Sequence, residues 1–478
     1  MAILERINTF VFGPVFPILL LLAGLYICIQ LRFFCFTHPL AVGRALFRRT
    51  EAQKNSSYSP FRALTLALAG TLGVGNIVGV AVALTAGGQG ALFWMVLSAF
   101  ATMLLKYCEI FLAVRHRKTH RTDKGEMHYG GPMYYISESP ASPRLRRRCA
   151  CLFAVLCIFA SFTLGNMIQI QALTESAREI WSIPPFLSGI AVTVIAFLLI
   201  FGGRDRISAF TVRAIPVMCA AYVLFSLIII FQNLSVLPSV LSAVMEEAFT
   251  PRAAGGGFSG ALLIAAMRHG VAKGVFSHEA GCGTASISHA GADTDSPARQ
   301  GLWGIVEVFV DTVLLCVMTA LVILVSWDTL RAEGYEGIVL TIKAYELYFG
   351  PAASHLITIS VLFFAFATLV CWSYYGLEAV RFLIPAPKAG TIYRFIFCAV
   401  TILGAQVSTS FIWELADFST MTMTLLNTSF VLLMLKEIKQ STLDFIHKQK
   451  QHSHKKSIAA AVLKSSTNNR QKPEKPAV

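Results

Sequence analysis

Eleven long apolar runs, separated by loops that hold most of the charge, constrain this chain more than any other feature. Each run reaches or approaches the roughly 20 apolar residues that a helix needs to cross the core of a bilayer. Only 14% of the 478 residues are charged, against about 25% in an average soluble domain. The sequence therefore predicts an all-α membrane protein with eleven transmembrane helices, which we place near residues 11–31, 61–85, 91–114, 149–175, 183–202, 209–232, 259–290, 301–326, 354–380, 391–409 and 412–435.

The basic residues collect in alternate loops, which predicts the orientation of the chain. They follow the first, third, fifth and ninth runs and recur in the tail, and an eleven-span topology puts all these segments on one side. The opposite loops are short or acidic, as with Glu246 and Glu247. The positive-inside rule then predicts an outer N-terminus and a cytoplasmic C-terminus. The net charge of +14 is explained by this pattern, so we expect a lipid bilayer and no nucleic acid as partner.

Two of the predicted spans contain clustered glycines and polar residues at mid-membrane depth, in residues 70–76 (GTLGVGN) and 276–284 (FSHEAGCGT). Glycine in a membrane helix often serves only close packing. Two such clusters five spans apart favour a different interpretation, in which both helices are broken. Unwound backbone in hydrocarbon persists only where it lines a cavity or a ligand site. Freed carbonyls suit a small cation, and half-helix N-termini suit a carboxylate.

The paired breaks also predict the organisation of the chain. Residues 59–233 and 234–436 become two five-helix units that enter the membrane from opposite sides, which is an inverted repeat. Residues 1–58 form one extra N-terminal helix and a basic loop. Residues 437–478 form a basic cytoplasmic tail that is too polar to fold alone, and we expect it to be disordered.

Several sequence blocks resemble the alanine/glycine:cation symporters, a family within the amino acid/polyamine/cation transporter superfamily. The resemblance covers residues 10–435, and its blocks are residues 71–77 (TLGVGNI), 87–95 (GGQGALFWM), 106–109 (KYCE), 130–136 (GGPMYYI), 165–169 (GNMIQ), 276–289, and 299–301 (RQG) with 311–312 (DT). It implies a fold similar to that of the amino-acid and neurotransmitter sodium symporters, preceded by one extra helix. The chain departs from the family pattern at Gln89, His278, Thr420 and Leu426.

The resemblance also implies the site residues. The substrate would be surrounded by Thr71, Gly73, Gly75, Gln169, Phe276, Ser277 and Gly281. Sodium would bind the carbonyls of Gly70 and Leu72 together with Asn76 and Thr368.

Three intramembrane carboxylates have another expected role, since such groups are costly without partners. We expect Glu279 to brace the second break. We expect Asp311 and Glu307, near the cytoplasmic end of their span, to act in interhelical hydrogen bonding or gating.

The predicted function is sodium-driven uptake of alanine or glycine by a transporter that functions as a monomer in a bacterial inner (plasma) membrane. No nucleotide-binding or catalytic motif occurs, so we expect neither an enzyme nor an organic cofactor. A proton-driven symporter that uses His278 or Glu279 is the nearer alternative. The other alternative is an amino-acid sensor that does not transport, although the tail is too short for a signalling domain.

Overall fold

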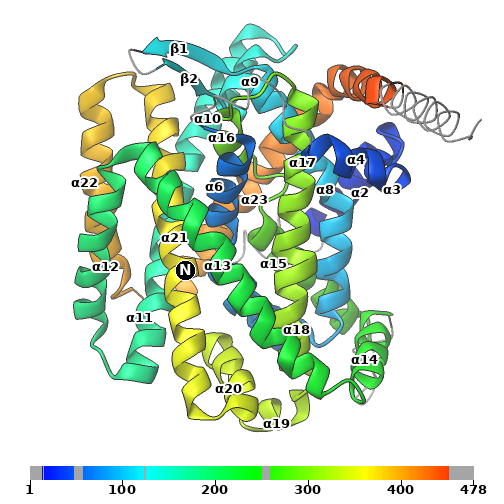
Figure 1. Cartoon of the computed structure of the whole chain (residues 1–478), viewed down its shortest axis with the longest axis vertical. Helices are drawn as coiled ribbons and strands as arrows, with labels where there is room; N and C mark the ends of the chain where they lie inside the picture. The colour runs from blue at the N-terminus through cyan, green and yellow to red at the C-terminus, as the bar shows by residue number, and fades with distance from the viewer. Residues whose placement is uncertain are drawn as a thin grey trace, which may run out of the picture.

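The computed structural model describes residues 13–451 except 14, 48–57, 123–124, 250–258, 408 and 450. These residues form a bundle of helices with one antiparallel hairpin at one end (Figure 1). The hairpin pairs β1 (Lys118–Thr122) with β2 (Gly125–Tyr129) in the loop after the third predicted span. The prediction of an all-α chain is therefore confirmed except for this short polar hairpin.

All eleven apolar ranges coincide with one helix or with consecutive helices. The ranges map in order onto α2 (Val15–Gln30); α6 (Pro60–Thr71), η1 (Val74–Asn76) and α7 (Val78–Gly87); α8 (Ala91–Arg115); α10 (Pro143–Phe162), η2 (Thr163–Met167) and α11 (Ile168–Trp181); α12 (Pro185–Ile200); α13 (Gly203–Gln232); α15 (Ser259–His278) and α16 (Thr284–Ala290); α17 (Pro297–Val308), η3 (Phe309–Cys316) and α18 (Val317–Leu324); α21 (Pro351–Leu383); α22 (Pro387–Gly404); and α23 (Thr409–Leu433). The connecting helices are α3 (Phe34–Thr37), α4 (Pro39–Phe47), α9 (Pro132–Glu138), α14 (Leu237–Phe249), α19 (Trp327–Ala332) and α20 (Gly337–Phe349).

Five of these helical stretches are long and apolar enough to cross a membrane by themselves. They are residues 91–115, 143–181, 203–232, 297–324 and 354–383, and residues 411–433 with the bent continuation 435–449 make a sixth candidate. The first break divides the range 61–85 into helices of 12 and 10 residues, so neither half has the required length. Large apolar side chains on α12 and α22, including Leu198 and Leu403, are exposed on the outside of the bundle. This chain is therefore a membrane protein whose outer helices present a surface for lipid.

Arginines from distant loops meet at the hairpin end of the bundle, where β1 and β2 lie beside the ends of α21 and α22 (Figure 1). Arg121 from the hairpin, Arg204 from α13, and Arg381 and Arg394 from α21 and α22 line two adjoining cavities there. The basic loops after the third, fifth and ninth ranges thus share one end, as their charge pattern predicts.

The beginning of the tail is ordered, which corrects the expectation of disorder for residues 437–449. Residues 435–449 form a helix bent by 64° from α23. Apolar residues recur at helical spacing within this polar segment, and Ile438 is fully buried. The hydroxyls of Thr442 and Tyr107 are 2.8 Å apart, and Lys439 donates to Gln30 of α2. The tail beyond residue 451 lies outside the described residues.

Close approach of η2 to α21 depends on Gly165. A Cβ atom at this position would lie 2.2 Å from Cβ of Trp372. Gly165→Ala is therefore expected to destabilise the protein by about 3 kcal/mol through overpacking. Gly79→Ala is the control, because a Cβ at Gly79 meets nothing within 4 Å. Thermal unfolding of the purified protein should show a lower melting temperature for the first variant alone. Equal melting temperatures for the two variants would show that η2 and α21 can move apart without loss of stability.

Candidate functional site

Both predicted helix breaks are present. The first separates α6 from α7 by the single turn η1, and the second separates α15 from α16. In the second break Glu279, Gly281 and Gly283 have φ angles of 51°, 93° and 84°. This left-handed conformation favours glycine, which explains why Gly281 and Gly283 occupy two of the three positions.

The two breaks touch each other at Gly75. A Cβ atom added there would lie 3.2 Å from Cδ1 of Phe276 and 3.3 Å from Cα of Ser277. These three residues were predicted to contact the substrate, and the structure brings them together. Only the absence of a side chain at Gly75 permits this approach between segments 200 positions apart in the sequence.

Gly73 brings two further helices to the first break. A Cβ at Gly73 would lie 2.7 Å from Oγ1 of Thr368 on α21 and 2.8 Å from Oε1 of Gln169 on α11. The Gln169 side chain accepts a hydrogen bond from the Val74 amide at 3.2 Å and donates to the Leu164 carbonyl. Four helical segments therefore converge on the glycines of the first break.

Asn76, Ser277 and Asp311 form a buried cluster of oxygen atoms between the two breaks. The Asn76 amide donates to the Asp311 carboxylate at 2.8 Å, and the Ser277 hydroxyl donates to the same carboxylate at 2.8 Å. Thr312 donates to it as well. Oδ1 of Asn76 is buried and has no hydrogen-bond partner in the described part of the chain. Asp311 thus lies at the level of the breaks, in the π-helical turn η3.

The carbonyls expected to bind sodium have side-chain partners from α21. Thr368 donates to the Ala69 carbonyl at 2.8 Å, one residue before the predicted ligand Gly70. The Gly70 carbonyl accepts from Nε1 of Trp372 at 3.3 Å. Leu72, the other predicted carbonyl, follows the last residue of α6 and is fully buried.

Two of the predicted substrate residues have other partners in this structure. The Thr71 hydroxyl contacts the carbonyl of Ala67 in its own helix at 3.4 Å. The Gly281 carbonyl accepts from Asn427 of α23, and a Cβ at Gly281 would lie 2.7 Å from Thr424 of the same helix. Gly281 therefore provides close contact between the second break and α23.

A lysine and two aromatic rings lie together beside the junction. The ammonium group of Lys273 lies 4.3 Å from the ring centroid of Trp413, whose ring is 4.7 Å from that of Phe276. Lys273 also pairs with Asp417 of α23 at 3.3 Å. We name Lys273, Phe276, Trp413 and Asp417 the lid cluster. It links α15 to α23 through one ion pair and one cation–π contact.

A cluster of buried charges lies on the opposite side of the second break. Lys106 pairs with Glu307 at 3.2 Å and donates to the His278 carbonyl at 2.9 Å. Glu307 also contacts His289, and Glu109 accepts from Asn427 at 2.6 Å. All these side chains are fully buried. Of these residues only Glu307 was expected to act in interhelical hydrogen bonding or gating. The charged residues inside apolar runs were the signal that could have identified Lys106 and Glu109 as well.

Glu279 joins the two breaks through one tryptophan. Its carboxylate accepts from the Thr284 hydroxyl across the second break and from Nε1 of Trp372 at 3.2 Å. The neighbouring His278 accepts from the Ala280 amide through Nδ1, so the imidazole caps the unwound segment.

A helical membrane bundle with two broken helices meeting at a polar, water-excluding junction defines a secondary transporter. The fold agrees with solved transporters: a sodium-coupled sialic acid symporter is 14% identical with a TM-score of 0.53, covering 88% of this chain and 84% of that one.

The chain belongs to the sodium:alanine symporter family, whose model matches residues 1–459. The sodium/alanine symporter AgcS of Methanococcus maripaludis is 35% identical over 421 residues, which cover 87% of this chain and 90% of that protein. The probable sodium/glutamine symporter GlnT of Bacillus subtilis is 30% identical, over 94% of this chain and 92% of that protein. The protein is thus a transporter of the sodium/amino-acid symporter class and not an enzyme.

Breaking the buried Lys106–Glu307 pair tests the charge cluster. Lys106→Met is expected to lower the free energy of unfolding by about 3–5 kcal/mol, because Glu307 keeps a buried charge without its partner. The double variant Lys106→Met/Glu307→Gln should recover much of this loss, and Lys343→Met, at a half-exposed pair, should cost less than about 1 kcal/mol. Denaturant unfolding measures all three. A double variant no more stable than Lys106→Met would show that the lysine acts through packing alone.

Proposed function

We propose that this protein imports a small neutral amino acid, alanine or glycine, together with sodium by alternating access. The observation that carries the proposal is the junction of Gly75 with Phe276 and Ser277 beside the Asn76–Asp311 cluster. Backbone that leaves the helix at bilayer depth persists where it is buried in protein or lines a cavity, and such breaks are typical of transporter binding sites. An amino acid brings both a carboxylate and an ammonium group to such a site.

The substrate would lie between the two breaks. Its carboxylate would accept from amides near Gly73 and Gly75 and from Gln169, at a helix end whose dipole favours anions. Its ammonium group would bind carbonyls near Phe276. The close packing of Gly73 against Thr368 and Gln169 supports a small substrate.

Sodium would bind the oxygens next to the substrate. Oδ1 of Asn76 is an unused buried acceptor, and Asp311 adds a carboxylate 2.8 Å from the Asn76 amide. We therefore add Asp311 and Ser277 to the predicted ligand Asn76. A second position would use Thr368 with backbone carbonyls at the end of α6, where Ala69, Gly70 and Leu72 lie.

We further propose that the chain crosses a bacterial inner membrane eleven times, with its N-terminus outside, and acts as a monomer. The coincidence of all eleven apolar ranges with helices supports the count. The two units, residues 59–233 and 234–436, would form the inverted repeat, each opening with its broken helix. The lid cluster would then lie on the outer side of the substrate, since the basic hairpin end is cytoplasmic.

Sodium coupling would supply enough free energy for accumulation. One sodium ion moving down about 100 mV yields about 2.3 kcal/mol, and a tenfold gradient adds about 1.4 kcal/mol. At one-to-one coupling these together support roughly 500-fold accumulation of the substrate.

A proton-driven version of the same transporter is the second candidate. Glu109, Glu279 and Glu307 are buried near a single lysine, Lys106, so two of the three carboxylates need a proton or another cation. The experiment below distinguishes the two ions.

Uptake of labelled alanine into proteoliposomes tests the proposal. A sodium gradient at fixed pH is expected to drive accumulation above the equilibrium level, and its absence should abolish it. Labelled glutamine under the same conditions tests whether the site admits a larger side chain. Accumulation driven only by a pH gradient would establish the proton version. Alanine binding without uptake under either gradient would favour the alternative in which the protein is an amino-acid sensor that does not transport.

Substitutions at the junction test the site. Gly73→Leu and Asn76→Ala are expected to abolish uptake while the protein still reaches the membrane. Asp311→Asn should raise the half-saturating sodium concentration at least about tenfold, since one negative charge facing the cation is lost. Gly79→Ala and the surface change Glu346→Gln are the matched controls. A normal half-saturating sodium concentration in Asp311→Asn would show that this carboxylate does not bind the cation.

A further inference from the structure

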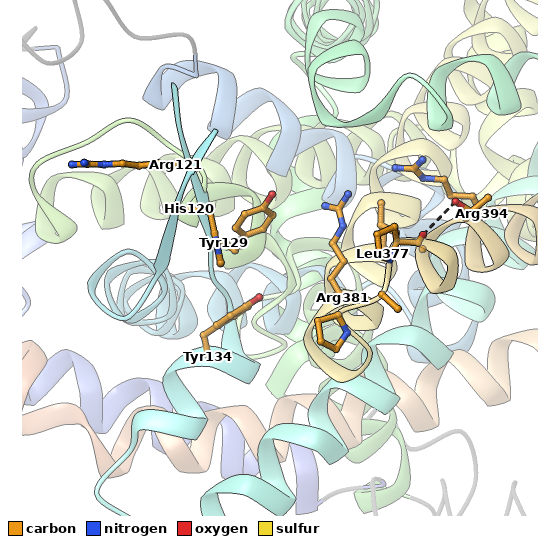
Figure 2. Close-up of a pocket in the computed structure, with 12 residues that line it drawn as sticks. His120, Arg121, Tyr129, Tyr134, Leu377, Arg381 and Arg394 are labelled. Carbon is orange, nitrogen blue, oxygen red and sulfur yellow. Dashed lines mark hydrogen bonds between the residues drawn. The ribbon is translucent and has the colours of Figure 1, made fainter. Parts of the chain in front are cut away.

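The hairpin end of the bundle contains a cavity of about 680 Å³ between β1–β2 and the link from α21 to α22. Its size lies within the roughly 300–1,000 Å³ typical of small-molecule sites. Arg121, Arg381 and Arg394 line it together with two tyrosines, and the described residues of its lining include no carboxylate. Figure 2 shows Arg381 and Arg394 on the side of α21 and α22, while Arg121 projects outward from the hairpin.

The three arginines differ in how many of their N–H donors have an acceptor within the protein. Arg381 is bonded to the buried Glu378, and Arg121 pairs with Glu126 in solvent. Arg394 stands 5.7 Å from the ring centroid of Phe201, and its Nε is buried with no hydrogen-bond partner in the described part of the chain. A buried guanidinium N–H without an acceptor is costly, so an anion with several acceptor oxygens would suit this cavity.

A phosphate group matches this requirement. Guanidinium groups bind phosphate oxygens through paired N–H donors, which makes arginine the preferred residue for such recognition. The hydroxyl of Tyr134 adds a further donor at the wall of the cavity.

An apolar surface next to the cavity indicates where the phosphate comes from. Ile392, Phe395 and Ile396 adjoin Thr391 and Arg394 on the same helix, and each is about half exposed on the outside of the bundle. A ligand with a phosphate in the cavity and acyl chains along α22 would satisfy both surfaces. Basic pockets between membrane helices bind anionic lipid headgroups in this manner.

We propose that this cavity binds the phosphate of an anionic phospholipid, with Arg394 as its principal contact. Phosphatidylglycerol and phosphatidylcholine with identical acyl chains are compared by native mass spectrometry of the purified full chain. Phosphatidylglycerol should bind more tightly. Arg394→Gln should weaken that binding about tenfold, and the exposed Arg121→Gln about threefold.

Arg148→Gln is the matched control, because it removes an equal charge from an exposed site on α10, a helix outside the cavity. Its phosphatidylglycerol binding should remain within about twofold of the unchanged protein. The melting temperature without lipid checks that Arg394→Gln folds. If that variant does not fold, the loss of phosphatidylglycerol binding in Arg121→Gln tests the proposal instead.

Two further outcomes are decisive. Inorganic phosphate that binds in lipid-free detergent and depends on Arg394 would support the phosphate site with a soluble source. Equal binding of the two lipids without phosphate binding would overturn the proposal, because the arginines would then not select an anionic headgroup. Equal losses in Arg394→Gln and Arg148→Gln would also overturn it, because the attraction would then be diffuse.

Discussion

Hydrogen bonds from side chains to the carbonyls of the two breaks are the interactions on which the rest of this structure depends. A carbonyl freed from a helix inside the bilayer has no water to bond and costs several kcal/mol if it stays unpaired. Here five such carbonyls are satisfied by side chains of neighbouring helices: Ala69 by Thr368, Gly70 by Trp372, Asn76 by Thr319, His278 by Lys106, and Gly281 by Asn427. The breaks are therefore stable only within the assembled bundle.

The donors belong to α8, α18, α21 and α23, so each break is held from several directions at once. A rigid movement of one helix group against another would exchange these hydrogen bonds together rather than singly, which favours discrete states over gradual deformation. A ligand shifts such an equilibrium only by its difference in affinity between the states. The oxygens of Asn76 and Asp311 offer that difference, because their spacing depends on how η1 and η3 are placed.

The sequence predicted the local features well and the distant pairings poorly. Clustered glycines identified both breaks, because few other residues tolerate such backbone. The family resemblance implied Gln169 and Thr368 as site residues, and these two do meet at Gly73. No local pattern predicts that Asp311 contacts Asn76, 235 residues away, since a π-helical turn sets the direction of its side chain. The tail helix was missed because its few apolar residues lie in a polar segment that is ordered only by contact with the bundle.

The single N–H of the Trp372 indole links the two breaks electrostatically. It lies 3.3 Å from the Gly70 carbonyl in the first break and 3.2 Å from the Glu279 carboxylate in the second. An ionised carboxylate is the stronger acceptor of the two. Protonating Glu279, or neutralising it with a cation, would therefore shift the indole toward Gly70, whereas a cation at the Gly70 carbonyl would release it toward Glu279. Charge at one break would thus affect the hydrogen bonding of the other through one shared donor.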